Sequence, residues 1–115
     1  DNTQSDQPSE ARTGEFDKLT WRATSGDLSA AWNGHYQTIA NANILLERIG
    51  SADMDATLRS RYVAEAKFIR ALMYFNLVRF FGDVPLILKE IRSEAEAYTY
   101  LREPAAAVYA QIEKD

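Results

Sequence analysis

The side chains that could carry out chemistry are few in this sequence, and they do not form a catalytic set. His35 is the only histidine and the chain contains no cysteine, so thiol nucleophiles, disulfides and cysteine metal sites are excluded. There is no supported Ser–His–Asp order, no Gly-rich phosphate loop and no HExxH motif. His35 falls in the apolar stripe of a predicted helix, where we favour a core histidine bonded to a neighbour over a base or metal ligand. We therefore expect no enzyme, no metal site and no cofactor.

A second group of polar residues follows one seam of a later helix. Glu65, Asn76 and Arg79 share this seam, which is either a polar binding strip or a hydrogen-bond network between helices. We favour the network, because buried polar groups need partners. Glu65 and Arg70 are five positions apart and do not face each other well on a helix.

Aromatic residues near the start of the chain either plug the edge of the core or present a flat face to a ligand. The first loop offers Phe16, Trp21 and Arg22, with Asn33 nearby, and these four are the predicted ligand-binding residues. If the ligand is a sugar, its pyranose ring would stack on an exposed flat aromatic, and amide, carboxylate or arginine groups would bind its hydroxyls. For Trp21 itself we favour the plug, since burial of an indole stabilises a fold.

Two long helices must position these residues. Residues 1–27 form a polar loop, and the first helix runs from about Leu28 to Ile49, with Asp27 as its cap and Gly50 as its stop. A short turn follows, with Asp53 or Asp55 as the cap of a second helix that ends at Gly82. So short a connection makes the two helices antiparallel neighbours. Asn43, at the margin of the first helix's apolar stripe, should bond the backbone or a neighbouring helix.

The second helix has apolar residues on two opposite sides. One stripe contains Tyr62, Ala66, Ile69, Met73, Leu77 and Phe80, and the other contains Ala64, Phe68, Ala71, Phe75 and Val78. Polar residues, among them Arg70, fill the seams between the stripes. A helix of this kind needs cover on both flanks, so the sequence predicts an internal helix of a layered helical array.

The remaining chain is predicted to contain short elements. Val84–Leu88 is an extended or edge segment, because Pro85 argues against a central strand, and residues 90–100 are a charged loop. Asp83, near Arg79, should bond the turn. A third helix opens at Glu103–Pro104, with Ala105, Val108, Tyr109 and Ile112 on its inner face. The fold class is all-α, an antiparallel helical hairpin plus a short third helix, with residues 28–115 as one segment.

Composition limits the function further. The chain has 115 residues, is 46% hydrophobic and carries a net charge of −4 without a basic cluster, which argues against nucleic acid binding. It contains no continuous apolar run of 18 residues, so we expect no membrane-spanning helix. No signal peptide or lipidation cysteine is recognisable. The chain starts in a polar loop and stops at Asp115, partway along the predicted third helix, so we expect a fragment of a longer protein, with loose packing or self-association through an uncovered flank.

The stretch Glu65–Leu86, EAKFIRALMYFNLVRFFGDVPL, resembles the SusD/RagB family of nutrient-binding outer-membrane lipoproteins of Bacteroidetes. The residues that carry the resemblance are Glu65, Ala66, Phe68, Arg70, Ala71, Tyr74, Phe75, Leu77, Val78, Phe81, Gly82, Asp83, Val84 and Pro85. The preceding helix matches at Trp32, Tyr36, Ile39, Ala42 and Asn43, and the following one matches from Arg102 to Asp115. Members of the family are several times longer, so only their N-terminal part is similar to this chain.

The resemblance implies a tetratricopeptide-like (TPR-like) helical array in which the central motif acts as scaffold, although the tetratricopeptide consensus itself is not matched. It also implies surface capture of an oligosaccharide or peptide and its delivery to a SusC-like TonB-dependent transporter, without catalysis. A lipid anchor that this chain lacks would hold the protein on the outer membrane. The alternative is a helical protein–protein interaction scaffold that binds no sugar.

Overall fold

The computed structural model describes residues 26–115. The chain divides after Gly34 into two units, and the described part of the first, residues 26–34, belongs to the helix α2 (Gly26–Arg48). After α2 come the 3-10 turn η2 (Ile49–Ser51), α3 (Ala56–Phe81), β1 (Val84–Pro85), α4 (Glu94–Ala97), β2 (Arg102–Glu103) and α5 (Ala105–Lys114). The predicted all-α class is confirmed.

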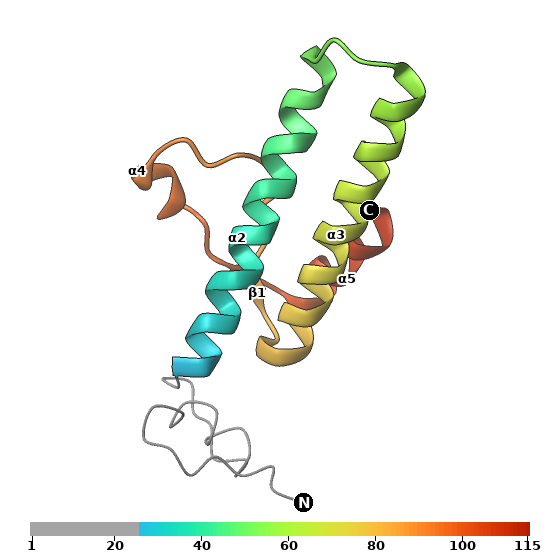
Figure 1. The fold of residues 1–115 in the computed structure, drawn as a ribbon. Coiled ribbons are helices and arrows are strands. Elements are labelled where there is room, and N and C mark those ends of the chain that lie inside the picture. The colour runs from blue at the N-terminus through green and yellow to red at the C-terminus, as the bar shows by residue number, and fades with distance from the viewer. Residues whose placement is uncertain (1–25) are drawn as a thin grey trace, which may run out of the picture. The chain divides into compact units, whose positions relative to one another are not determined.

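Within residues 35–115, α2 and α3 form the predicted antiparallel hairpin, joined by a short loop, and α5 lies against α3 (Figure 1). Asp55 caps α3, because its Oδ2 accepts a hydrogen bond from Leu58 N at 3.0 Å. Gly82 ends α3 with φ +71°, a conformation that costs glycine little and other residues more. Of the two caps that the sequence allowed for α3, Asp55 is the correct one.

Several predicted boundaries were wrong by a few residues. Helix α2 begins at Gly26 rather than Leu28, so Asp27 lies in its first turn and is not a cap before it. Pro104 is the N-cap of α5 rather than its first helical residue. Ser93 opens one turn of helix, α4, inside the stretch expected to be a loop. The Ser93 hydroxyl accepts a hydrogen bond from Glu96 N at 3.1 Å, which accounts for the extra turn.

The edge segment predicted after Gly82 is present as β1, which pairs with β2 in an antiparallel register of Val84 with Glu103 and Pro85 with Arg102. The Asp83 carboxylate bonds the start of α5 rather than its own turn, accepting Ala105 N at 2.8 Å. Arg79 instead bonds Asn76 and the Phe75 carbonyl. The turn after α3 is therefore tied directly to the start of α5.

The buried line of α3 differs from both predicted stripes. Its buried residues are Ala66, Arg70, Tyr74, Leu77 and Val78, which recur at helical spacing along a line between the two stripes. Arg70, expected in a polar seam, is only 6% exposed, whereas Phe68 is 67% exposed. The hydropathy pattern misplaced this face because Arg70 and Tyr74 bury polar ends that have hydrogen-bond partners. The expectation of cover on both flanks fails for the described residues.

Candidate functional site

The predicted ligand-binding residues are only partly visible in the structure. Phe16, Trp21 and Arg22 lie outside the described residues. Asn33 lies on α2 with its side chain exposed to solvent. The ligand-binding role of these four residues therefore stays a prediction.

The most developed polar site of residues 35–115 is a buried network that holds the extended segment after β1 against α2 and α3. At its centre the Tyr74 hydroxyl donates a hydrogen bond to the Ile87 carbonyl at 2.9 Å and accepts one from the Ile87 N–H at 2.7 Å. Tyr36, on α2, donates to the Pro85 carbonyl at 2.6 Å. The two phenol rings meet edge to face, with their centroids 6.2 Å apart. Side chains here replace the neighbouring strand that would otherwise satisfy this backbone.

Burial raises the pKa of both phenols above the usual value for tyrosine. For Tyr74, the hydrogen bond with Ile87 and the charge of Arg70 act in the opposite direction, and burial prevails. For Tyr36, the neighbouring Tyr74 adds to the effect of burial. Both hydroxyls therefore keep their protons and act as hydrogen-bond donors, which suits a structural role rather than that of a base.

Asn43 extends the network from α2. Its Nδ2 donates to the carbonyls of Ile87 at 3.0 Å and Lys89 at 3.4 Å, and its Oδ1 accepts a hydrogen bond from Arg70 Nη1 at 3.0 Å. The amide has no solvent exposure. The prediction that Asn43 bonds backbone or a neighbouring helix is confirmed, and it does both.

Arg70 connects this network to the end of α5. Its Nε and Nη2 donate to the two carboxylate oxygens of Asp115 at 2.7 Å and 2.6 Å. The side chains of both residues are almost fully buried, at 8% and 3% exposure. Sequence reasoning missed this pair because the partners are 45 positions apart. The available signal was that both residues match the family pattern.

The polar residues that were expected to share one seam of α3 do not all lie together. His35 Nε2 lies 3.3 Å from Asn76 Nδ2, so the expected bond to a neighbour is present, although His35 is half-buried rather than part of the core. Asn76 Oδ1 also accepts a hydrogen bond from Arg79. Glu65 does not join them; it pairs on the surface with Arg61 at 3.2 Å. The seam network therefore exists, but without Glu65.

The two phenylalanines of the scaffold motif, Phe68 and Phe75, lie nearer the surface than expected. Phe75 is 39% exposed and contacts the edge of the Tyr109 ring, with centroids 6.5 Å apart. The Arg79 guanidinium lies 4.2 Å from the centre of the Phe75 ring. Phe68 lies beside Ala64, Glu65 and Ile69 at an open, apolar depression. These residues mark a face of α3 that the described residues leave partly uncovered.

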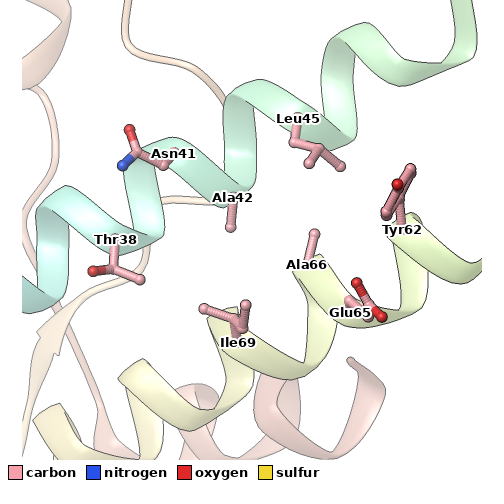
Figure 2. Close-up of a pocket in the computed structure, with 8 residues that line it drawn as sticks. All are labelled: Thr38, Asn41, Ala42, Leu45, Tyr62, Glu65, Ala66 and Ile69. Atoms are coloured by element: carbon pink, nitrogen blue, oxygen red, sulfur yellow. The ribbon is translucent and has the colours of Figure 1, made fainter.

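A small groove separates α2 from α3. Figure 2 shows it lined by Thr38, Asn41, Ala42 and Leu45 from α2 and by Tyr62, Glu65, Ala66 and Ile69 from α3. Its volume is about 230 Å³, below the range of about 300–1,000 Å³ usual for small-molecule sites. Ala42 and Ala66 point toward each other across it (Figure 2). We therefore interpret the groove as a gap left between the helices by small side chains rather than as a ligand site.

Two further features bear on function. Within residues 26–115, no cluster of histidine, aspartate and glutamate side chains could hold a metal ion. None of the helices in this range has the length and apolar character needed to cross a membrane.

Comparison with known proteins connects this geometry to a family. A family model described as "Starch-binding associating with outer membrane", SusD-like, matches residues 2–115. Among curated proteins, SusD-like protein P2 of Formosa agariphila is 32% identical over 96% of this chain, which spans 22% of that relative. SusD-like protein P25 of the same organism is 39% identical over 56% of the chain, which spans 14% of it.

Solved structures show the same relationship. The fold matches a laminarin-binding SusD-like protein with a TM-score of 0.80 and 37% identity over 93% of this chain, which spans 23% of that structure. A SusD superfamily protein of Parabacteroides distasonis matches with a TM-score of 0.77 and 37% identity over 95% of this chain, and this chain again spans 23% of it. This chain therefore shares its fold with these proteins, and it belongs to the SusD-like family.

Proposed function

We propose that this chain is part of a carbohydrate-binding protein at the bacterial outer membrane, in which it mainly provides scaffold. The observation that carries the proposal is the family match over residues 2–115. The 0.80 TM-score to a laminarin-binding SusD-like protein supports it. Because the chain spans only about a fifth of its relatives, at 22% and 23%, the whole protein's ligand and partners belong to this proposal.

The polar network supports the proposed scaffold role. Tyr74, Asn43 and Tyr36 hold the backbone from Pro85 to Lys89 in place, and Arg70 ties α3 to the end of α5 through Asp115. A loop that is ordered before the ligand arrives loses less conformational entropy when the ligand binds. We infer that residues 35–115 act as scaffold by holding the segment from Pro85 to Lys89 in a fixed position.

We further propose that the protein captures an oligosaccharide, or alternatively a peptide, and passes it to a SusC-like TonB-dependent transporter. An N-terminal lipid outside this chain would place it on the cell surface. Capture and delivery break no covalent bond, so the protein is proposed to bind its ligand rather than to be an enzyme.

The proposal is tested by measuring binding of the natural-length protein to laminarin, starch and a mixed peptide library by calorimetry. Saturable binding of a glycan that Trp21→Ala weakens would support both the function and the predicted ligand loop. Saturable glycan binding that Trp21→Ala leaves unchanged would remove Trp21 from the site but keep the function. If neither glycan binds while peptides do, the ligand class is wrong. Co-purification with a TonB-dependent transporter tests the partner.

A second function is favoured by the partly exposed apolar residues of α3. Phe68 is 67% exposed, and Ile69 and Leu72 are each 42% exposed. A protein–protein interaction scaffold without sugar binding would use such a face. This alternative predicts that Phe68→Ser abolishes capture of the partner while glycans leave the protein unaffected. The carbohydrate-binding proposal predicts that the same substitution leaves glycan affinity unchanged.

A further inference from the structure

The connection between strands β1 and β2 carries an exposed aromatic side chain. Residues 86–101 link β1 to β2 and include α4, which lies away from α3 on the far side of α2 (Figure 1). Tyr98, just after α4, is 77% exposed, more than any other large apolar or aromatic side chain of the described residues. An aromatic ring left in water at this extent is a candidate contact surface, because soluble proteins usually bury much of it.

The backbone around Tyr98 is held by a dense set of local hydrogen bonds. Glu96 is their centre: its carboxylate accepts Arg92 N at 3.1 Å, and its carbonyl accepts both Thr99 N at 3.0 Å and Thr99 Oγ1 at 2.7 Å. The hydrogen bond from Arg92, with help from Lys89, lowers the pKa of the Glu96 carboxyl, so it stays ionised. The ring is therefore presented on an ordered turn rather than on a free tail.

Ion pairs attach this turn to α2. Arg48 Nη2 contacts Glu90 Oε1 at 2.6 Å, and Arg92 Nη2 lies 3.8 Å from Glu47 Oε2. Exposed pairs of this kind are individually weak. Together these ion pairs restrict the movement of the loop, and they leave the Tyr98 ring exposed.

A carboxylate stands beside the ring. The Tyr98 hydroxyl donates to Glu94 Oε1 at 3.2 Å, four residues earlier on the same face of the turn. Within residues 26–115 no donor binds the second oxygen, Oε2, and Glu94 is itself exposed. An oriented flat ring with an adjacent acceptor oxygen is the pairing that recognises a sugar, since the ring covers the C–H face and the carboxylate accepts a hydroxyl.

We propose that Tyr98 and Glu94 form a carbohydrate contact in which the Tyr98 ring stacks on a pyranose of a neutral oligosaccharide and Glu94 Oε2 accepts one of its hydroxyls. This inference rests on the proposed function and adds a second loop to the one predicted around Trp21. The sequence shows Tyr98 only as part of a charged stretch. Its exposure and its bond to Glu94 become visible once α4 forms.

The test is an NMR titration of the isotope-labelled chain with laminariheptaose and, separately, with maltoheptaose, following the aromatic C–H signals of Tyr98. We expect saturable shifts at Tyr98 with one of these glucans. Tyr98→Ala should weaken binding about three- to tenfold, the worth of one aromatic contact. Tyr98→Phe keeps the ring and should retain most of the affinity. Leu101→Ala, at a position that is 76% exposed in the same loop, is the matched control and should bind like wild type.

The possible outcomes distinguish this inference from the proposed carbohydrate-binding function on which it rests. Glycan-dependent shifts elsewhere in the chain, with Tyr98 unmoved and Tyr98→Ala binding like wild type, would overturn the contact and leave carbohydrate binding standing. A loss of affinity in Leu101→Ala equal to that in Tyr98→Ala would also overturn it, because the effect would then be one of loop structure. Absence of any shift with both glucans, together with no glycan binding by the natural-length protein, would overturn both.

Discussion

Arg70 and Asp115 form a buried bidentate ion pair that fastens the end of α5 to the middle of α3, with N–O distances of 2.7 Å and 2.6 Å. The third donor of the guanidinium binds Asn43 on α2 at 3.0 Å. A single side chain of α3 thus contacts both helices beside it. The pair therefore links α5 directly to α3.

We expect Arg70→Met to lower the free energy of unfolding by about 3–5 kcal/mol, because it leaves the Asp115 carboxylate buried without its partner. Arg70→Lys should also destabilise, since an ammonium group cannot make the paired bonds. Urea denaturation measures both. Arg61→Ala, which removes an exposed pair with Glu65, is the control and should cost less than about 1 kcal/mol. An Arg70→Met variant as stable as that control would contradict the role given to the pair.

Tyr74→Phe tests the hydroxyl that bonds both backbone groups of Ile87. The substitution keeps the ring but leaves the Ile87 N–H without its hydrogen bond, so we expect a loss of about 1–3 kcal/mol in stability. Amide exchange at Ile87 should accelerate more than exchange in the middle of α3. Tyr109→Phe is the matched control, since this tyrosine is 42% exposed and should change stability little. Unchanged protection of the Ile87 amide would refute the assignment.

The two buried tyrosines predict a loss of stability in alkali. Burial raises the pKa of Tyr36 and of Tyr74 in the folded protein, so above the unfolded value of about 10 the unfolded chain binds fewer protons than the folded one. Stability contributed by the neutral phenols is therefore complete below about pH 10 and declines as the pH rises toward the folded values. Unfolding at several pH values should show this decline, and Tyr36→Phe should reduce its slope. A flat profile would contradict the shifts.

The exposed face of α3 predicts that the isolated chain associates with itself or packs loosely. Phe68 and Phe80 are 67% and 63% exposed, and burial of such rings is favourable by roughly 1.5–3 kcal/mol each. Phe68→Ser should shift sedimentation toward monomer. Leu101→Ser removes an equally exposed side chain from the β1–β2 connection and should not do so. A compact, cooperative wild-type monomer at high concentration would refute this prediction.

Local sequence signals predicted the elements of the fold well. The Asp55 cap and Gly82 define the ends of α3 because capping and positive φ depend on a few adjacent residues. The short turn between the helices made an antiparallel hairpin the expected arrangement. The resemblance carried by the stretch from Glu65 to Pro85 also identified the family correctly.

The candidate sites were harder to predict, because they depend on which distant segments meet. The position of Arg70 on the buried line of α3 depends on Asp115 and Asn43, which come from other elements. No periodicity of α3 alone could show that an arginine belongs inside. Distant segments also decide which strand pairs with Val84, that Asp83 bonds the start of α5, and that Tyr98 is left exposed.

The sequence by itself determined that two long helices form a hairpin, that α3 ends at Gly82, and which family the chain belongs to, since each depends on neighbouring residues or on a contiguous motif. Only the tertiary structure decided which face of α3 is buried and which polar groups are paired. The physical reason is that burial of a polar side chain becomes acceptable only when its partners are in place, and here those partners lie up to 49 positions away, as in the bond from Tyr36 to Pro85.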